Sequence, residues 1–220
     1  MFGWLVRLLR GPFGGVLEQA VAQPSAPLTL PAHATVGGRD LTLRYLEQSD
    51  GPAILAFARA LPAHDMLFLR RDITKDDQVA AWLRDAATGL ATTVFATDGN
   101  VIVGYATVAS DGLTWTRHIR ELRVLVAAEM RGQHLGRLLT EQAFAVAREQ
   151  GAKKMVAQMT TDQVGAIRAF RRIGFAPEAR LRSQVIDREG HLHDLQIMTI
   201  DIDEFQSKLE AAISAAIPPT

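Results

Sequence analysis

The sequence contains no cysteine among its 220 residues, and this absence excludes several kinds of site. A chain without thiols forms no disulfide scaffold, zinc–thiolate site or iron–sulfur cluster, and it offers no cysteine nucleophile. The chain also lacks a charge excess, because 24 Lys plus Arg balance 24 Asp plus Glu. This balance argues against a general nucleic-acid binder, which carries a surplus of Lys and Arg.

Long hydrophobic runs are missing as well. No apolar stretch approaches the roughly 18 residues that a membrane-spanning helix needs, so the sequence predicts no membrane span. The N-terminal apolar stretch is interrupted by Arg7 and Arg10 and has no positive charge before it, which argues against a signal peptide. Its helical spacing instead predicts a short amphipathic helix, docked on the body of the protein or on a partner.

We divide the chain into three parts. Residues 1–40 hold the N-terminal helix and a connector rich in Pro and Gly, residues 41–200 form the main domain, and residues 201–220 form a C-terminal helix and tail. The second half of the main domain alternates strand and helix, which indicates parallel crossovers on one sheet. The expected elements are, in order, a strand at 41–47, helices at 51–61 and 76–89, a hairpin of strands 92–97 and 101–109, a strand at 118–126, a helix at 133–151, a strand at 153–159, a helix at 163–174, two strands within 183–200, and a helix at 203–217.

The segment from Glu121 to Arg148 carries the clearest functional signal. A strand leads through a glycine-containing turn into a long helix, whose N-terminus offers unpaired N–H groups and the positive end of the helix dipole. Phosphate is the natural ligand here, and two arginines in the turn would add charge-assisted hydrogen bonds. The glycines match neither the dinucleotide nor the P-loop pattern, so on this segment alone a purely structural turn stays open. The turn comprises Arg131, Gly132, Gln133, His134, Leu135, Gly136 and Arg137.

Together with a second motif downstream, the sequence resembles the GNAT superfamily of acetyl-CoA-dependent N-acetyltransferases. The first motif is VLVAAEMRGQHLGRLL, and the second is QVGAIRAFRRIGF, with Gln163, Ala166, Phe170, Gly174 and Phe175. The resemblance covers about residues 41 to 200. It implies a mixed α/β (α+β) fold, in which helices flank a splayed central sheet, with helical extensions at both ends of the chain.

The resemblance also implies acetyl-CoA as co-substrate, without a metal. The backbone of Val124, Leu125 and Val126 would pair with the pantetheine arm, and residues 131–137 would bind the pyrophosphate. On the other side of the cofactor, the implied neighbours are Gln163, Ala166 and Phe170.

Three residues depart from the family pattern. His134 replaces the middle glycine of the turn and would crowd the phosphates unless its side chain points outward or donates to one, although histidine tolerates unusual backbone angles better than most residues. Gln163 stands where Asn is usual and keeps the amide. Phe170 stands where many members place a Tyr that protonates the departing thiolate. Because a thiolate with a pKa of about 8.5 is a tolerable leaving group, water or another donor could suffice.

Glu121 is the first candidate for the general base that takes a proton from the acceptor amine. The competing interpretation is a solvated carboxylate at a strand end, paired with Arg120 or Arg123. His118 is the second candidate base, with surface or packing roles as the alternative. Gln158 occupies another position that relatives use, and an amide cannot serve as a base.

The acceptor side is expected to come from the first two helices and the loop between them. In this loop, Arg70, Arg71 and Asp72 would select a carboxylate or an amine, or would be solvated. His191 and His193 lie two positions apart, but no further ligands accompany them, so we interpret them as surface residues.

The sequence therefore predicts an N-acetyltransferase that moves acetyl from acetyl-CoA directly to a primary amine of a small molecule, amino acid or peptide. The alternative is an acyl-CoA-binding regulatory or interaction protein with weak or no turnover, which His134 and Phe170 would favour. We expect a cytoplasmic protein that binds no nucleic acid. The apolar faces of the terminal helices leave packing on their own domain or across a homodimer open.

Overall fold

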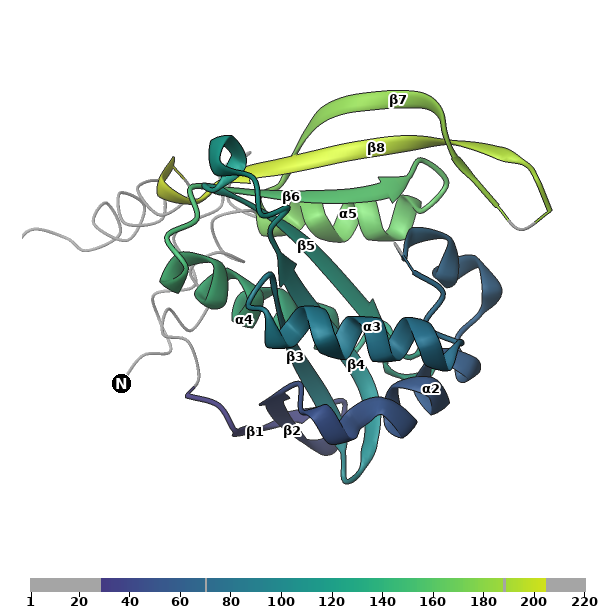
Figure 1. Ribbon diagram of the computed structural model, residues 1–220, viewed down its shortest axis with the longest axis vertical. Helices are drawn as coiled ribbons and strands as arrows, with labels where there is room; N and C mark the ends of the chain where they lie inside the picture. The colour runs from purple at the N-terminus through teal and green to yellow at the C-terminus, as the bar shows by residue number, and fades with distance from the viewer. Residues whose placement is uncertain (1–28, 70, 188, 205–220) are drawn as a thin grey trace, which may run out of the picture.

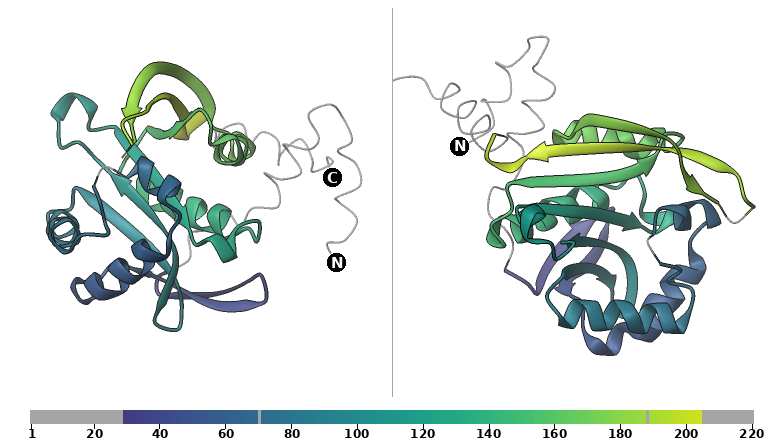
Figure 2. Two further views of the ribbon diagram at one scale, coloured as in Figure 1. Left: turned by 90° about the vertical axis from the view of Figure 1, so that its right-hand side faces the viewer. Right: turned by 45° about the horizontal axis from the view of Figure 1, so that its top comes forward.

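The computed structural model describes residues 29–69, 71–187 and 189–204 (Figure 1). Its core is one eight-stranded sheet with the order β1-β2-β3-β4-β5-β6-β8-β7. Helices α2 and α3 cover one face of the sheet, and helices α4 and α5 cover the other (Figure 2). No helix among the described residues is long and apolar enough to cross a membrane. The predicted mixed, splayed sheet flanked by helices is confirmed.

The strands are β1 (Ala32–Val36), β2 (Arg39–Tyr45), β3 (Ala91–Asp98), β4 (Val101–Ala109), β5 (Ile119–Val126), β6 (Lys154–Thr160), β7 (Ala176–Ile186) and β8 (Leu192–Asp201). The α-helices are α2 (Gly51–Ala60), α3 (Asp76–Ala87), α4 (Leu135–Glu149) and α5 (Val164–Ile173). Four short 3₁₀ turns connect them: η2 (Gln48–Asp50), η3 (Ala63–Phe68), η4 (Thr114–Thr116) and η5 (Ala128–Met130).

One predicted boundary is wrong. The segment assigned to a connector before residue 41 contains β1, which pairs antiparallel with β2 and extends the sheet. Gly37 and Gly38 join the two strands with φ values of 58° and 79°, a left-handed conformation that favours a tight hairpin turn. In this segment, Pro and Gly therefore delimit an edge strand. The predicted N-terminal helix and nearly all of the predicted C-terminal helix lie outside the described residues.

The sheet splits between β5 and β6. These two parallel strands are paired at only three positions, Ile119 with Lys154, Arg120 with Met155, and Glu121 with Val156. Beyond Glu121, β5 stays paired with β4, whereas β6 stays paired with β8, and the two strands diverge (Figure 1). The second half of β5 thus turns a backbone edge toward the opening instead of toward a neighbouring strand.

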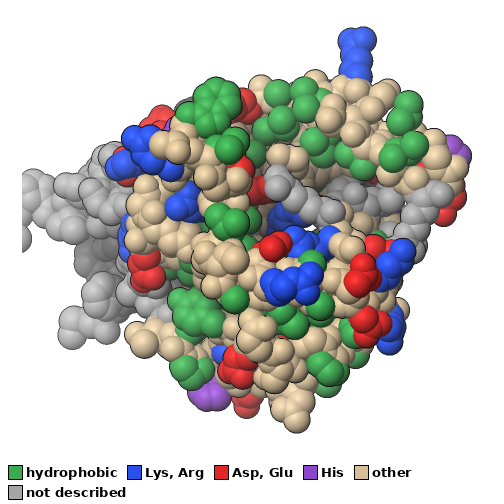
Figure 3. Space-filling view, in the orientation of Figure 1, with side chains coloured by type: hydrophobic (Ala, Val, Ile, Leu, Met, Phe, Trp, Pro, Cys, Tyr) green, Lys and Arg blue, Asp and Glu red, His purple; other side chains and the backbone are tan. Residues whose placement is uncertain are grey.

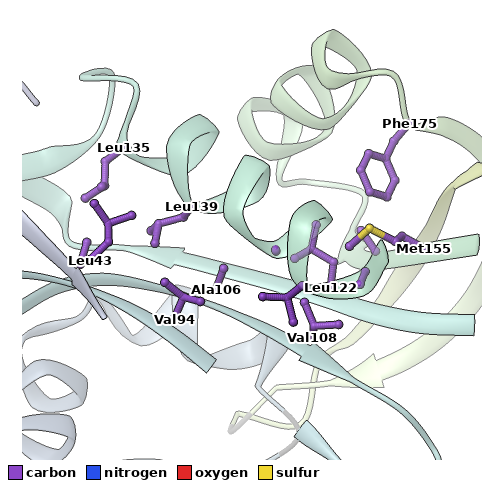
Figure 4. Close-up of a cluster of buried hydrophobic side chains, with 14 of the residues drawn as sticks. Leu43, Val94, Ala106, Val108, Leu122, Leu135, Leu139, Met155 and Phe175 are labelled. Atoms are coloured by element: carbon purple, nitrogen blue, oxygen red, sulfur yellow. The ribbon is translucent and has the colours of Figure 1, made fainter. Parts of the chain in front are cut away.

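Two hydrophobic clusters hold the helices on the sheet. On one face, Leu135 and Leu139 of α4 point toward the sheet side chains, among them Leu43 and Val94 (Figure 4). A Cβ at Gly104 of β4 would lie 3.0 Å from the Leu125 carbonyl oxygen and 3.1 Å from Leu139 Cδ1. Only glycine therefore lets α4 approach this closely. The second cluster lies under α2 and α3 and contains the aromatic residues Phe57, Trp82, Phe95 and Tyr105.

Candidate active site

The predicted phosphate-binding turn connects β5 to α4. Gly132 has a φ of 74°, and His134, the N-cap residue of α4, has a φ of 68° and a ψ of 3°. His134 is exposed, and its side chain makes no capping hydrogen bond. The first N–H groups of α4, from Leu135 onward, are those that have no partner within a helix. The turn thus combines a left-handed backbone with a helix N-terminus, as the sequence predicts.

Both arginines of this turn already bind carboxylates. Arg131 forms an ion pair with Asp65 of η3, and its Nε donates to the Val126 carbonyl oxygen at 3.4 Å. Arg137 Nε donates to Glu141 Oε1 of the next helical turn at 2.9 Å. Arg131 thereby ties η3, in the segment between α2 and α3, to the turn.

Gln133 joins the turn to the β1–β2 hairpin. Its Nε2 donates to the Glu129 carbonyl oxygen at 2.7 Å, and its Oε1 is buried without a hydrogen-bond partner among the described residues. A Cβ at Gly37 would lie 1.5 Å from that Oε1. The amide of Gln133 therefore occupies the space that a side chain at residue 37 would take.

The other predicted cofactor residues lie on the two sides of the opening between β5 and β6. The side chains of Val124 and Val126 pack with the α4 cluster, whereas Leu125 packs with the α2–α3 cluster. Across the opening, Gln163 is the N-cap residue of α5, and its N–H donates to the Thr160 carbonyl oxygen at 3.1 Å.

Ala166 and Phe170 follow on α5 and pack against the α4 cluster. The ring of Phe170 meets the ring of Phe175 edge-on at 5.0 Å, and Phe175 in turn meets Phe144 of α4 at 5.9 Å. This aromatic row fastens α5 to α4 behind the opening. The two sequence motifs, separated along the chain, are brought together at this point of the fold.

The two candidate bases lie in different surroundings. Glu121 Oε1 accepts a hydrogen bond from Arg123 Nε at 2.9 Å, and its side chain is only 13% exposed. Its ion-pair partner is Arg123, whereas Arg120 donates to Gln150. The carboxylate is thus paired, as the competing interpretation expects, but it is not solvated. His118 is exposed, just before β5, and neither His118 nor Glu121 is among the residues that line the cavity described next.

A cavity of about 210 Å³ lies on the face of the sheet that α3 covers. Figure 3 shows this face hollowed above α3, with acidic and basic side chains around the hollow. The charged residues of the lining are Arg71, Asp85 and Arg123, and Arg71 Nη2 donates to Asp85 Oδ2 at 2.5 Å. The other lining residues are Leu69, Ile73, Trp82, Leu90, Ala91, Tyr105, Thr107, Ala109 and Ser110.

Sequence reasoning missed Asp85, Tyr105 and Thr107 as neighbours of this cavity. Burial raises the pKa of the Tyr105 phenol far above its usual value, so the hydroxyl stays protonated. Strand alternation puts Tyr105 and Thr107 on one face of β4, and this signal is readable from the sequence. The strand register that sets Thr107 of β4 opposite Arg123 of β5 cannot be predicted from the sequence alone.

His191 and His193 both approach the carboxylate of Asp187, at 3.2 Å from Nδ1 and 2.9 Å from Nε2 respectively. These contacts hold the pKa of Asp187 at about 2, chiefly through the hydrogen bond with His193. Within the described ranges, no group of three or more His, Cys, Asp or Glu residues is arranged to hold a metal ion.

Comparisons with known proteins agree with this arrangement. Residues 56–175 match the family model described as "Acetyltransferase (GNAT) family". An L-methionine sulfoximine/L-methionine sulfone acetyltransferase of Salmonella typhimurium is 28% identical over 169 residues, covering 74% of this chain and 96% of the relative. The L-amino acid N-acyltransferase MnaT of Escherichia coli is 24% identical over 168 residues, covering 74% of this chain and 95% of the relative.

Solved structures agree as well. An acetyltransferase from Salmonella typhimurium, solved with acetyl-CoA, superposes with a TM-score of 0.65 at 23% identity, covering 74% of this chain and 95% of its own. A ribosomal-protein-alanine N-acetyltransferase from Brucella melitensis superposes with a TM-score of 0.64 at 24% identity, and the match covers 72% of this chain and 98% of the Brucella protein. These structural likenesses show the fold, and the family match over residues 56–175 shows that the chain belongs to the acetyltransferase (GNAT) family and is an acyltransferase.

Proposed function

We propose that this protein transfers the acetyl group of acetyl-CoA directly to a primary amine of a small molecule, amino acid or peptide. The observation that carries the proposal is the divergence of β5 from β6 directly before the turn at the N-terminus of α4. An extended thioester arm fits beside an unpaired strand edge, and a phosphate fits at a helix N-terminus. The two relatives whose names state amino-acid substrates support the amine as acceptor.

The residues present fit acetyl-CoA. The backbone of residues 124–126 would hold the pantetheine arm, and the turn at residues 131–137 would hold the pyrophosphate, since the exposed His134 side chain does not cap the N–H groups of α4. The group that acetyl-CoA supplies is an acetyl thioester. Gln163, Ala166 and Phe170 would border it from α5, where Ala166 and Phe170 are partly buried.

The chain's own chemistry is limited to a proton acceptor and a hydrogen-bond donor. Glu121 would accept the proton that the amine loses, and a backbone N–H near Leu125 or Val126 would donate to the oxyanion of the tetrahedral intermediate. Phe170 offers no proton to the departing thiolate. At a pKa of about 8.5, that thiolate can leave without one.

Calorimetric titration with acetyl-CoA and with CoA tests the first step, and both are expected to bind. Release of free thiol from acetyl-CoA is then measured with a panel of primary amines, and mass spectrometry identifies the acetylated product. Failure of both ligands to bind would refute the proposal. Binding without thiol release on any amine would favour the regulatory alternative, to which Phe170 points.

The Gly37→Ala substitution is expected to weaken acetyl-CoA binding about fivefold. Its methyl group would overlap Gln133 Oε1, so the amide must leave its place and the phosphate-binding turn loses its support. The matched control is Gly38→Ala, which has a similarly positive φ of 79° but no atom within 4 Å of the added Cβ. Calorimetry should show the wild-type affinity for Gly38→Ala. Equal losses in the two variants would contradict a role for Gln133.

A further inference from the structure

The charged side chains at the cavity on the α3 face form two ion pairs. Two arginines and one aspartate line it, Arg71 from the loop before α3, Asp85 from α3 and Arg123 from β5. Asp85 is paired with Arg71, and Arg123 is paired with Glu121 of its own strand. Both carboxylates near the cavity therefore already have cationic partners. A polyamine, which carries several positive charges, would find no unpaired carboxylate among these residues and would be repelled by the two arginines.

Arg71 has a donor group for which the described residues supply no acceptor. Its Nη2 binds Asp85, while its Nη1 is buried and has no hydrogen-bond partner among the described residues. A buried polar group without a partner is costly, and a guanidinium is especially suited to bind a carboxylate through two parallel N–H groups. An oxygen of a ligand in the cavity could accept from this group, and the positive charge of the guanidinium favours an anionic oxygen.

Given the proposed acetyl transfer, we infer that Arg71 binds the carboxylate of a free α-amino acid whose amine is the acceptor. A zwitterion brings the anionic oxygen that Arg71 lacks and adds no net charge. With the carboxylate of the amino acid bound at Arg71, its amine would point toward β5, the strand that carries Glu121 and Arg123. Arg71 thereby sets the substrate class without taking part in the chemistry.

The remaining walls define the side chain of this amino acid. Leu69, Ile73, Trp82 and Leu90 supply apolar surface, whereas the uncharged polar groups come from Tyr105, Thr107 and Ser110. The volume of about 210 Å³ is below the roughly 300–1,000 Å³ of pockets for drug-sized ligands. A free amino acid with a medium-sized, uncharged side chain fits these walls better than a charged one.

Three acceptors that share the isobutyl group of leucine test the inference: L-leucine, L-leucinamide and 3-methylbutylamine. The wild-type kcat/KM is expected to be at least about tenfold higher for L-leucine than for the other two, because only L-leucine has the carboxylate. Equal values for all three would overturn the carboxylate site while leaving acetyl transfer established. Absence of transfer with all three, while another amine of the panel releases thiol, would overturn the inference and leave acetyl transfer established; absence of release with every amine would count against the proposed function instead.

Binding to the CoA-saturated protein, measured by calorimetry, decides the inference independently of turnover. L-leucine is expected to bind at least about tenfold more tightly than L-leucinamide. Equal affinities, or no binding of either, would overturn the inference.

The variants Arg71→Met and Asp85→Asn separate carboxylate binding from loop structure, since both break the same ion pair. Only Arg71→Met is expected to abolish the preference for L-leucine over L-leucinamide, and Asp85→Asn should keep it. If Arg71 merely anchors its loop, both variants will lose activity on the two acceptors in equal proportion. Circular dichroism and the melting temperature establish that each variant is folded.

Discussion

Replacement of Glu121 by Gln is expected to lower kcat for acetyl transfer roughly 100-fold, since a positioned general base contributes about 10²–10⁴ in rate. Without the carboxylate, only acceptor molecules that are already neutral can react. The remaining rate should therefore rise about tenfold per pH unit below the pKa of the acceptor amine, which is a steeper dependence than that of the wild type. Steady-state rates with one amine from pH 6 to pH 10 measure both effects.

Two matched variants decide whether Glu121 acts as a base or as the partner of Arg123. Arg123→Met keeps the carboxylate and removes the guanidinium that hydrogen-bonds it at 2.9 Å. If the ion pair alone matters, Arg123→Met and Glu121→Gln will lose the same activity with parallel pH profiles. His118→Gln changes an exposed residue outside the cavity and is expected to keep the wild-type profile. An unchanged profile in Glu121→Gln would transfer the role of base to His118.

The fold was largely predictable where the sequence has strong local signals. The hairpin of β3 and β4 surrounds Asp98, Gly99 and Asn100, and α4 shows apolar residues at helical spacing, so both were found. The short edge strand β1 was missed because it follows Pro31 and precedes two glycines, which signal a loop. Its strand character depends on pairing with β2, a long-range interaction that composition does not report.

The candidate site also has a part with local sequence signals and a part that depends on long-range contacts. Residues 131–137 form one continuous segment, a turn followed by the start of α4, and Gln163 to Phe170 span the start and body of α5, so short motifs were enough to predict these local structures. The cavity instead combines residues from the loop before α3, from α3 itself and from the three strands β3, β4 and β5. Which strand residues face it depends on the register between β4 and β5 and on the bulge near Thr97, neither of which a single sequence specifies.

Replacement of Phe95 by Ala is expected to lower the free energy of unfolding by about 3–5 kcal/mol, the usual cost of removing a buried aromatic ring. Phe95 is 0% exposed, and its ring lies edge-on to those of Trp82 and Tyr105 at 6.2 and 6.1 Å. Trp115→Ala is the control, since Trp115 is 78% exposed and its loss should cost less than about 0.5 kcal/mol. Chemical denaturation followed by circular dichroism compares the two, and similar midpoints would contradict the expected role of Phe95.

The functional effect of Phe95→Ala should be confined to one side of the sheet. Trp82 and Tyr105 belong both to the aromatic cluster around Phe95 and to the wall of the cavity, so a void at Phe95 loosens the acceptor side. The phosphate-binding turn is held by the separate cluster around Leu135 and Leu139. The KM for the acceptor is therefore expected to rise severalfold while the dissociation constant for acetyl-CoA stays near the wild-type value. If both affinities fell together, the effect of Phe95 would extend across the sheet, and its confinement to the cavity side would be contradicted.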